Sequence, residues 1–150
     1  MADHRYIEFI EKIISRTKSN SLNWSYLDTK KELYEGMGWV NTKTEYELFR
    51  GNKEIITPDF NVEDSFYTNI DNMYIVIYVW RDQPAKLYIV PYTYKKVTSL
   101  TPDEYGEYIT RLLNLVQSQF PNAETFIDSF LENEGDKKSD WGSIYETKTN

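Results

Sequence analysis

The chain lacks cysteine and has a single histidine, and these two absences remove several kinds of chemistry. Without cysteine there are no disulfides, no thiolate nucleophiles and no cysteine-ligated zinc or iron–sulfur sites. With only His4, a histidine-based catalytic triad and a multi-histidine metal site are both excluded. His4 also lies at the very start of the chain, which is a poor place for a general base. We therefore expect no catalytic residues, no metal site and no cofactor.

Long apolar runs are lacking as well. The longest, Met73 to Trp80, has eight residues, whereas a membrane-spanning helix needs about 20. The N-terminus shows neither the apolar segment nor the small-residue cleavage site of a secretion signal. Together with the absence of cysteine, these features predict a cytoplasmic protein that does not contact a membrane.

Positive charge is scarce, with 17 lysines and arginines against 24 acidic residues and a net charge of -7. Residues 101–136 hold eight of the acids and one base, so the rest of the chain is neutral overall. A sequence-independent grip on nucleic-acid phosphates needs a basic stripe, and none is visible. Direct nucleic-acid binding is therefore not expected.

Two short patterns resemble functional motifs but do not complete them. Gly36-Met37-Gly38 begins like a dinucleotide-binding fingerprint, yet Asn41 stands in place of the third glycine. The carboxylates around Asp59 and Glu63 are similar to the start of a nuclease motif, but the acid and lysine that should follow are missing. We interpret them as solvated turn residues. A pair of carboxylates that meets only in the folded chain stays open.

The composition is that of one folded domain, with 40% hydrophobic and 27% charged residues in a chain of 150. Asp3 is placed to cap a helix whose apolar residues recur every three or four positions as far as residues 19–20. In the mixed stretch that follows, Asp28 would cap a short helix that ends at Gly36. From Thr44 the apolar period shifts toward two, which is typical of strands.

Five strands are predicted, with a first turn at Gly51-Asn52: residues 44–50, 53–57, 65–70, 73–81 and 86–94. Because no helix separates them, we expect an antiparallel meander rather than a parallel sheet. Thr101, Pro102 and Glu104 then carry three agreeing signals for a helix start. This helix should stop at Phe120, and a last helix should follow from Asn122.

These elements predict an α+β fold with an N-terminal helix, a five-stranded meander and two C-terminal helices packed on one sheet face. Residues 1–133 would form a single domain, and residues 134–150 a polar tail. Within the tail, "DWGSIY" at 140–145 could be a short docking motif, but we favour its folding back on this copy or a neighbouring one.

The stretch "YIVIYVWRDQPAKLYIVPYTY", residues 74–94, separates into two faces, because strand side chains alternate. One face is aliphatic: Ile75, Ile77, Val79, Leu87 and Ile89. Like faces join only if paired residue numbers have an even sum, for example Val79 with Leu87 or Ile89. This register predicts a loop of three or five residues around 82–85, with the aliphatic face packed on the helices.

The other face is aromatic: Tyr74, Tyr78, Trp80, Tyr88, Tyr92 and Tyr94. These rings could be structural, because tyrosine favours strands and can cover a neighbouring strand or an overlying segment. They could instead form a surface for a partner or a planar ligand, because Tyr and Trp dominate binding hot spots. The sequence leaves both interpretations open.

The acidic residues of the C-terminal helices are a second candidate surface: Asp103, Glu104, Glu107, Glu124, Asp128 and Glu132. The last three follow at four-residue spacing and so form one stripe, where like charges disfavour the helix by about 0.2 to 0.5 kcal/mol per pair. A stripe of like charges that lowers the stability of its own helix indicates either a solubilising face or a patch that recognises a basic partner.

The segment "FIEKIISRTKSNSLNWSYL", Phe9 to Leu27, resembles the opening of many small bacterial and phage proteins without a known activity. These share an amphipathic helix, a Thr-Lys-Ser-type end and a tryptophan shortly afterwards. The resemblance implies a bacterial or phage origin. Our leading hypothesis is a non-enzymatic, intracellular interaction factor of the inhibitor, immunity or anti-defence type, whose acidic helices bind a protein partner. The alternative is a small-ligand receptor that holds a planar or nucleotide-like molecule on the aromatic face. A homodimer stays open.

Overall fold

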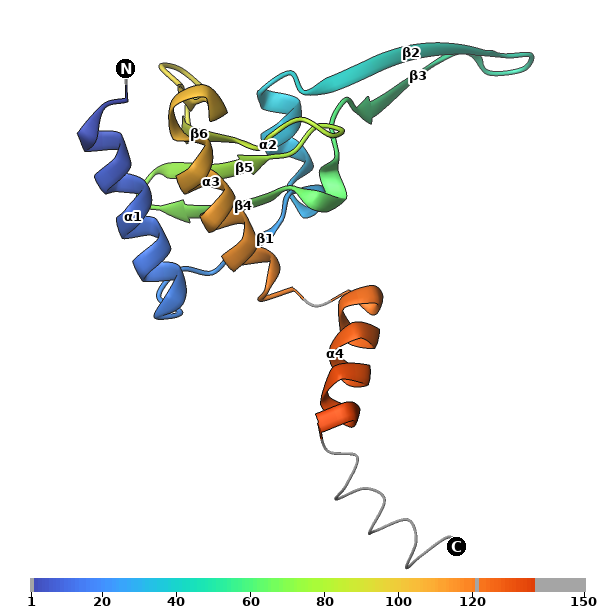
Figure 1. The fold of residues 1–150 in the computed structure, drawn as a ribbon. Helices are drawn as coiled ribbons and strands as arrows, with labels where there is room; N and C mark the ends of the chain where they lie inside the picture. The colour runs from blue at the N-terminus through green and yellow to red at the C-terminus, as the bar shows by residue number, and fades with distance from the viewer. Residues whose placement is uncertain (1, 121, 137–150) are drawn as a thin grey trace, which may run out of the picture. The chain divides into compact units, whose positions relative to one another are not determined.

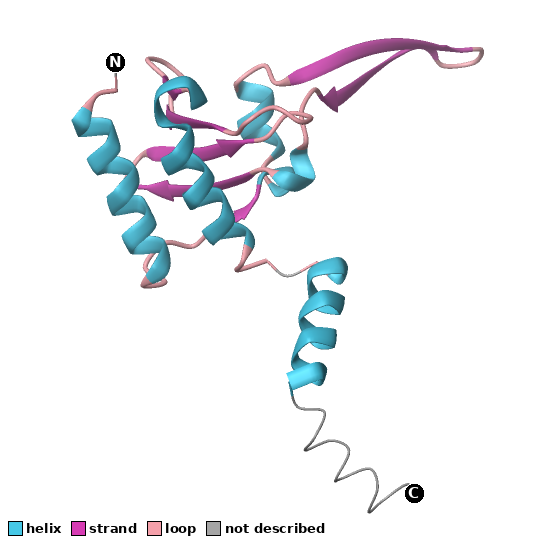
Figure 2. Cartoon of the chain, in the orientation of Figure 1, coloured by secondary structure: helices cyan, strands magenta, loops and turns pink. Residues whose placement is uncertain are grey.

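The computed structural model describes residues 2–120 and 122–136, and it shows an α+β protein (Figures 1 and 2). The chain divides into two compact units, Met1–Val116 and Gln117–Asn150. The first contains helices α1 (His4–Lys18) and α2 (Lys31–Gly36) and both sheets. It ends within the last turn of α3 (Pro102–Gln117). The second contains α4 (Ala123–Asp136). The predicted tail motif at 140–145 lies outside the described residues.

The main sheet has five antiparallel strands in the order β1-β4-β5-β6-β7. These strands are β1 (Ser25–Tyr26), β4 (Phe66–Ile70), β5 (Met73–Tyr78), β6 (Lys86–Pro91) and β7 (Thr98–Leu100). The strands β2 (Val40–Glu47) and β3 (Gly51–Pro58) pair with each other in a separate two-stranded sheet. A five-stranded antiparallel sheet is therefore present, and the predicted strands at 65–70, 73–81 and 86–94 correspond to its β4, β5 and β6. The predicted strands at 44–50 and 53–57 instead form the separate sheet, and β1 and β7 take their places in the main one.

The difference follows from what each segment can bury. Along β2 and β3 no side chain is buried and most are exposed, so this hairpin has no apolar face to place against a core. The edges of the main sheet are instead β1, with two residues, and β7, with three. Strands this short show no detectable alternation in sequence. The sequence therefore revealed the hairpin but not where it belongs.

The register of the central strands agrees with the parity argument. Ile75 pairs with Ile89 and Ile77 with Leu87, so like faces are joined. The connecting loop, however, comprises residues 79–85 and is longer than predicted. Pairing stops because the Val79 N–H donates to Ser65 Oγ at 2.9 Å and the Val79 carbonyl accepts from the Asn61 N–H at 2.9 Å. Both backbone groups of Val79 are thus used by the segment before β4.

Helices α1 and α3 lie over the same face of the sheet (Figure 1). The predicted Asp3 cap is confirmed, since its side chain accepts from the Arg5 N–H at 2.8 Å. Helix α3 begins at Pro102, as predicted. The two helices meet where Tyr6 and Tyr105 pack edge to face at 6.0 Å and the Asp3 N–H donates to the Tyr105 hydroxyl at 2.9 Å. The core residues they bury are Ile10, Ile13, Ile14, Ile109, Leu112 and Val116.

The segment before β2 differs from its prediction in one detail. Asp28 lies inside a 3-10 turn, η1 (Leu27–Thr29), and the N-cap of α2 is Lys30, which makes no side-chain capping bond. Helix α2 does end at Gly36. A second 3-10 turn, η2 (Val62–Asp64), precedes β4. Because α4 belongs to the second unit, which we describe by itself, the predicted packing of this helix on the sheet stays a prediction.

Candidate functional site

The aromatic face of the sheet is largely covered by a second layer of the first unit. Val76 and Val90 lie fully buried on this face, beneath residues from η1 and α2. The Trp39 ring lies 4.8 Å from the rings of both Tyr78 and Tyr88. The covering residues are Leu27, Leu33, Tyr34, Met37, Trp39, Val40, Phe60 and Val62. The rings are therefore packed against this protein's own chain, which favours the structural interpretation.

Phe60 also packs on the sheet, stacking on Tyr78 with ring centroids 5.0 Å apart. The same ring meets Tyr34 edge to face at 5.7 Å. Trp39 and Phe60 thus occupy the positions that a planar ligand on Tyr78 and Tyr88 would need. Trp80 and Tyr92 differ from the other rings of this face, because their exposed fractions are 38% and 40%.

Tyr94 is fixed at the border of this layer by a tight backbone approach. Its hydroxyl donates to the Glu32 carbonyl at 3.3 Å, and its own backbone has a positive φ of 61°. A Cβ added at Gly36 would lie 2.7 Å from the Tyr94 ring, so only glycine leaves room for that ring at the end of α2. Burial raises the pKa of Tyr94, as it also raises the pKa of Tyr88.

Tyr78 has the most perturbed electrostatic environment on this face. Burial, and next the nearby Asp59 carboxylate, raise the pKa of Tyr78 to about 12. Among the described residues, Asp59 Oδ1 is a buried side-chain oxygen without a hydrogen-bond partner. A negative charge held next to a phenol keeps that phenol protonated. Tyr78 is thus suited to holding its proton rather than to transferring it.

A small hollow of about 160 Å³ lies beside the exposed end of this face. Its lining residues are Tyr78, Trp80, Gln83, Pro84, Lys86 and Pro102. The Arg81 guanidinium lies over the Trp80 ring at 4.9 Å, a cation–π contact that holds this side chain outside the hollow's lining. The volume is well below the roughly 300 Å³ at which pockets for drug-sized ligands begin.

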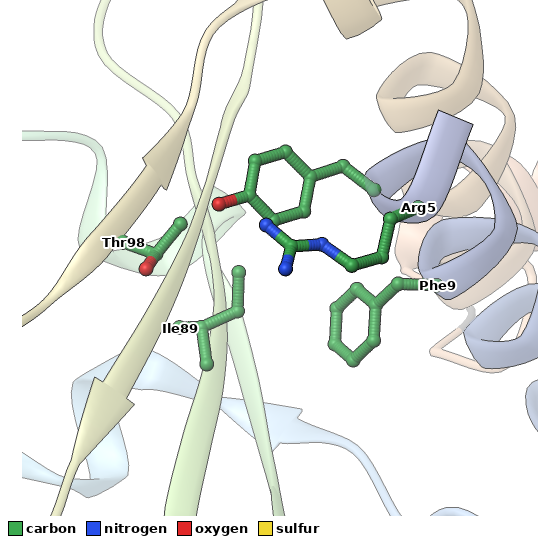
Figure 3. A pocket seen from close by; sticks show the side chains of 5 residues that line it. Arg5, Phe9, Ile89 and Thr98 are labelled. Atoms are coloured by element: carbon green, nitrogen blue, oxygen red, sulfur yellow. The ribbon is translucent and has the colours of Figure 1, made fainter. Parts of the chain in front are cut away.

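A larger pocket of about 240 Å³ opens between α1 and the other face of the sheet. Figure 3 shows Arg5 and Phe9 of α1 facing Ile89 and Thr98 of the sheet. Tyr6 also lines the pocket. The walls are almost entirely apolar. The one charge is Arg5, whose side chain is 75% exposed and whose guanidinium lies 4.9 Å from the Tyr6 ring centroid. No local sequence pattern predicts this pocket, because its residues come from α1 and from two strands that are distant from it in the chain.

The β2–β3 hairpin forms an arm that projects from the first unit (Figure 1). Its turn comprises residues 48–50 and is completed by Gly51 at a positive φ of 76°, not by the predicted Gly51-Asn52 pair. Three large side chains gather at the tip: Tyr46, Leu48 and Phe49 are 71%, 73% and 94% exposed. Sequence reasoning missed them. The available signal was an apolar cluster at the end of an otherwise polar hairpin.

The charges of this arm are balanced along its length. Lys43 pairs with Glu45 at 3.7 Å and Arg50 with Glu47 at 3.9 Å. The tip therefore offers apolar side chains flanked by the Arg50–Glu47 ion pair, without the stripe of positive charge that binding to nucleic-acid phosphates requires. This combination is typical of a protein-docking element.

In the second unit, α4 presents an apolar stripe and an acidic stripe. The apolar side chains Phe126, Ile127, Phe130 and Leu131 are 62%, 47%, 51% and 61% exposed. The rings of Phe126 and Phe130 stack at 5.9 Å. The acidic residues Glu124, Asp128 and Glu132 are exposed as well, and no basic residue occurs in the last turn. The predicted stripe is thus present on one helix.

The other acidic residues of the predicted surface, Asp103, Glu104 and Glu107, are exposed on α3. They belong to the first unit, whereas the α4 stripe belongs to the second. Asp103 and Glu104 lie in the first turn of α3, where negative charge stabilises a helix, so a structural role accounts for these two.

Within residues 2–120 and 122–136, no group of three or more histidine or carboxylate side chains could hold a metal ion. Each helix in this part of the chain is too short or too polar to cross a bilayer. Comparison of the chain with models of known protein families, with curated proteins and with solved structures finds no match.

Proposed function

We propose that this protein acts by binding another protein, and that α4 is its docking helix. The observation that carries the proposal is the exposed apolar stripe of α4 next to a stripe of negative charge, with no basic residue in the last turn of the helix. The partner we infer has an apolar groove with basic residues along its rim. An inhibitor, immunity or anti-defence role, as expected from the sequence, would operate through such a contact.

The two stripes adjoin rather than oppose each other. Side chains on a helix follow at about 100° per residue, which places Glu124 and Asp128 beside the edge formed by Ile127 and Leu131. A surface that covers the apolar stripe would therefore also face these carboxylates. Binding of a helix in a groove uses anchors at this spacing, and complementary charge at the rim speeds association and selects the partner.

The energetics of α4 also favour a bound state. A helix of 14 residues is marginal in water on its own. The like charges at Glu124, Asp128 and Glu132 disfavour it further, by about 0.2 to 0.5 kcal/mol per pair. Burial of a Phe or Leu side chain against a partner contributes roughly 1.5 to 3 kcal/mol. Burial of the apolar stripe against a partner would therefore stabilise α4 by more than its like charges destabilise it. A second copy of α4 is a poor match, because it would bring two acidic stripes together.

The test begins with affinity capture from the cells that make the protein, followed by titration with the purified captured protein. We expect the triple reversal of Glu124, Asp128 and Glu132 to lysine to abolish binding, and Phe126→Ala with Leu131→Ala to weaken it by about 100-fold or more. The matched control reverses Glu8 and Glu11, two exposed acids of α1. Equal loss in the control, or unchanged binding in the triple variant, would overturn the proposal.

A further inference from the structure

We infer that the tip of the β2–β3 arm docks into the apolar pocket on α1 of a second copy of this chain. The inference is independent of the α4 contact proposed above, because both the arm and the pocket belong to the first unit. It connects two features that the fold leaves unexplained, namely a nearly fully exposed Phe49 and an open apolar pocket of about 240 Å³.

The pocket has the size of one side chain. It is smaller than the roughly 300 Å³ at which pockets for drug-sized ligands begin, whereas an apolar cavity of about 150 Å³ already holds a benzene ring. Tyr6, Phe9 and Ile89 supply walls on which an aromatic ring can pack, and Thr98 lies at the sheet side (Figure 3). The best-fitting occupant is therefore a phenylalanine side chain rather than a metabolite.

The arm supplies such a side chain together with a matching charge. Phe49 is 94% exposed at the tip, and Glu47 lies two residues before it, where one of its two carboxylate oxygens lies 3.9 Å from Arg50. At the rim of the pocket, the Arg5 side chain is 75% exposed, with Asp3 3.6 Å away as its partner. Because an arginine has several N–H donors, Arg5 can bind Glu47 and keep Asp3. An aromatic anchor with a carboxylate beside it thus complements an apolar pocket with a guanidinium at its rim.

The occupant has to come from another copy. In Figure 1 the arm leaves the first unit on the side away from α1. Its strands have eight residues each, so the tip lies on the order of 26 Å from the root at about 3.3 Å per residue. Because the arm extends away from α1, its tip does not reach the pocket of its own chain, but it is long enough to reach the pocket of a second copy. Reciprocal exchange of arms gives a closed dimer, and a one-way contact gives an open chain of copies.

The first experiment measures self-association of the full chain by sedimentation velocity at increasing concentration. We expect Phe49→Ala to weaken association at least about ten-fold. The matched control is Met73→Ala, which removes an exposed apolar side chain from β5, outside both the arm and the pocket. If the unaltered chain stays monomeric up to about 1 mM, or if only the control variant loses association, the inference is wrong.

A mixing experiment tests the two halves of the contact separately. Thr98→Trp fills the pocket but keeps the arm, whereas Phe49→Ala removes the anchor but keeps the pocket. Each variant alone should fail to associate, and their mixture should form a heterodimer through the one intact arm and the one intact pocket. Complementation also shows that both variants are folded. Two folded variants, judged by circular dichroism, that do not complement each other would refute the docking.

A charge exchange tests the role of Arg5. We expect Arg5→Glu and Glu47→Arg each to weaken association, and the double variant to recover it, because the ion pair is restored with reversed sign. Arg16→Glu, an exposed change on the same helix, is the control and should have no effect. Recovery that fails in the double variant would place the Arg5 contact elsewhere and count against the arm as the occupant.

Discussion

The aromatic face of the sheet and the tip of the β2–β3 arm are both rich in large apolar side chains, yet the fold covers the first and leaves the second exposed to solvent. Tyr78 and Tyr88 are covered by Trp39 and Phe60, whereas Phe49 at the tip is 94% exposed. The density of rings in the sequence was far higher on the sheet. It therefore indicated where the core would be, whereas the sparse cluster on a polar hairpin corresponds to the exposed apolar tip.

The covering layer explains this contrast. Phe60 is the second residue after β3, and Trp39 directly precedes β2, so residues at the root of the arm bury the aromatic face. The Asp59 N–H donates to the Trp39 carbonyl at 3.1 Å and closes this root. The arm is thus anchored in the core by its base while its tip reaches solvent.

The strongest test of the comparison removes the ring that covers the sheet. Phe60→Ala leaves a cavity against Tyr34, Trp39 and Tyr78, and we expect it to lower the free energy of unfolding by about 3 kcal/mol. Urea denaturation followed by tryptophan fluorescence measures the change. A loss below about 1 kcal/mol would mean that the aromatic face is not held by its cover.

The close approach at Gly36 gives a smaller effect. Gly36→Ala places a Cβ against the Tyr94 ring, and we expect it to lower the free energy of unfolding by about 1 to 2 kcal/mol. In a Tyr94→Ala background the same change should lose most of this penalty, because the clash is gone. Gly106→Ala is the matched control: its nearest atom would be Pro102 Cβ at 3.5 Å, so helix propensity should make it stabilising by about 0.5 to 1 kcal/mol. Thermal melts compare the three variants.

The raised pKa of Tyr78 makes the covered face sensitive to high pH. Because the folded protein holds this proton up to a pKa of about 12, above the ordinary value of 10.0, its contribution is fully present below pH 10 and is lost as pH rises toward 12. Partial exposure limits the contribution to about 1 kcal/mol. Urea denaturation at pH 9 and at pH 11.5 should show a steeper loss for the unaltered chain than for Tyr78→Phe. Tyr88 and Tyr94 are present in both proteins, so equal slopes would exclude Tyr78 as the cause.

The tip should show the smallest effect on stability. Phe49→Ala removes an exposed side chain, so the free energy of unfolding of the monomer should change by less than about 0.5 kcal/mol. In the same sample, amide hydrogens of β2 and β3 should exchange much faster than those of β5, because the hairpin is solvated on both faces. Measured at concentrations where the chain is monomeric, slow exchange in the arm would show that it packs on its own unit.

Much of the local structure could be predicted from local signals. The Asp3 cap, the start of α3 at Pro102 and the even register of β5 with β6 each depend on residues close in sequence or on strict alternation. The length of the loop at 79–85 could not be predicted, because Val79 is held by Ser65 and Asn61 rather than by β6. Likewise, the edges of the sheet are too short to show a period.

The candidate surfaces divide in the same way. The acidic and apolar stripes of α4 follow from the helical period alone, so the sequence was sufficient to identify Glu124, Asp128 and Glu132 as neighbours. Contacts between segments far apart in the chain decided three other features. These are which strands join the main sheet, which residues cover Tyr78 and Tyr88, and where the pocket around Arg5 and Ile89 forms. The physical reason is that a repeating pattern in the sequence shows which side of a helix or strand is apolar. Which other element buries that side depends on how all the elements pack together in the folded chain.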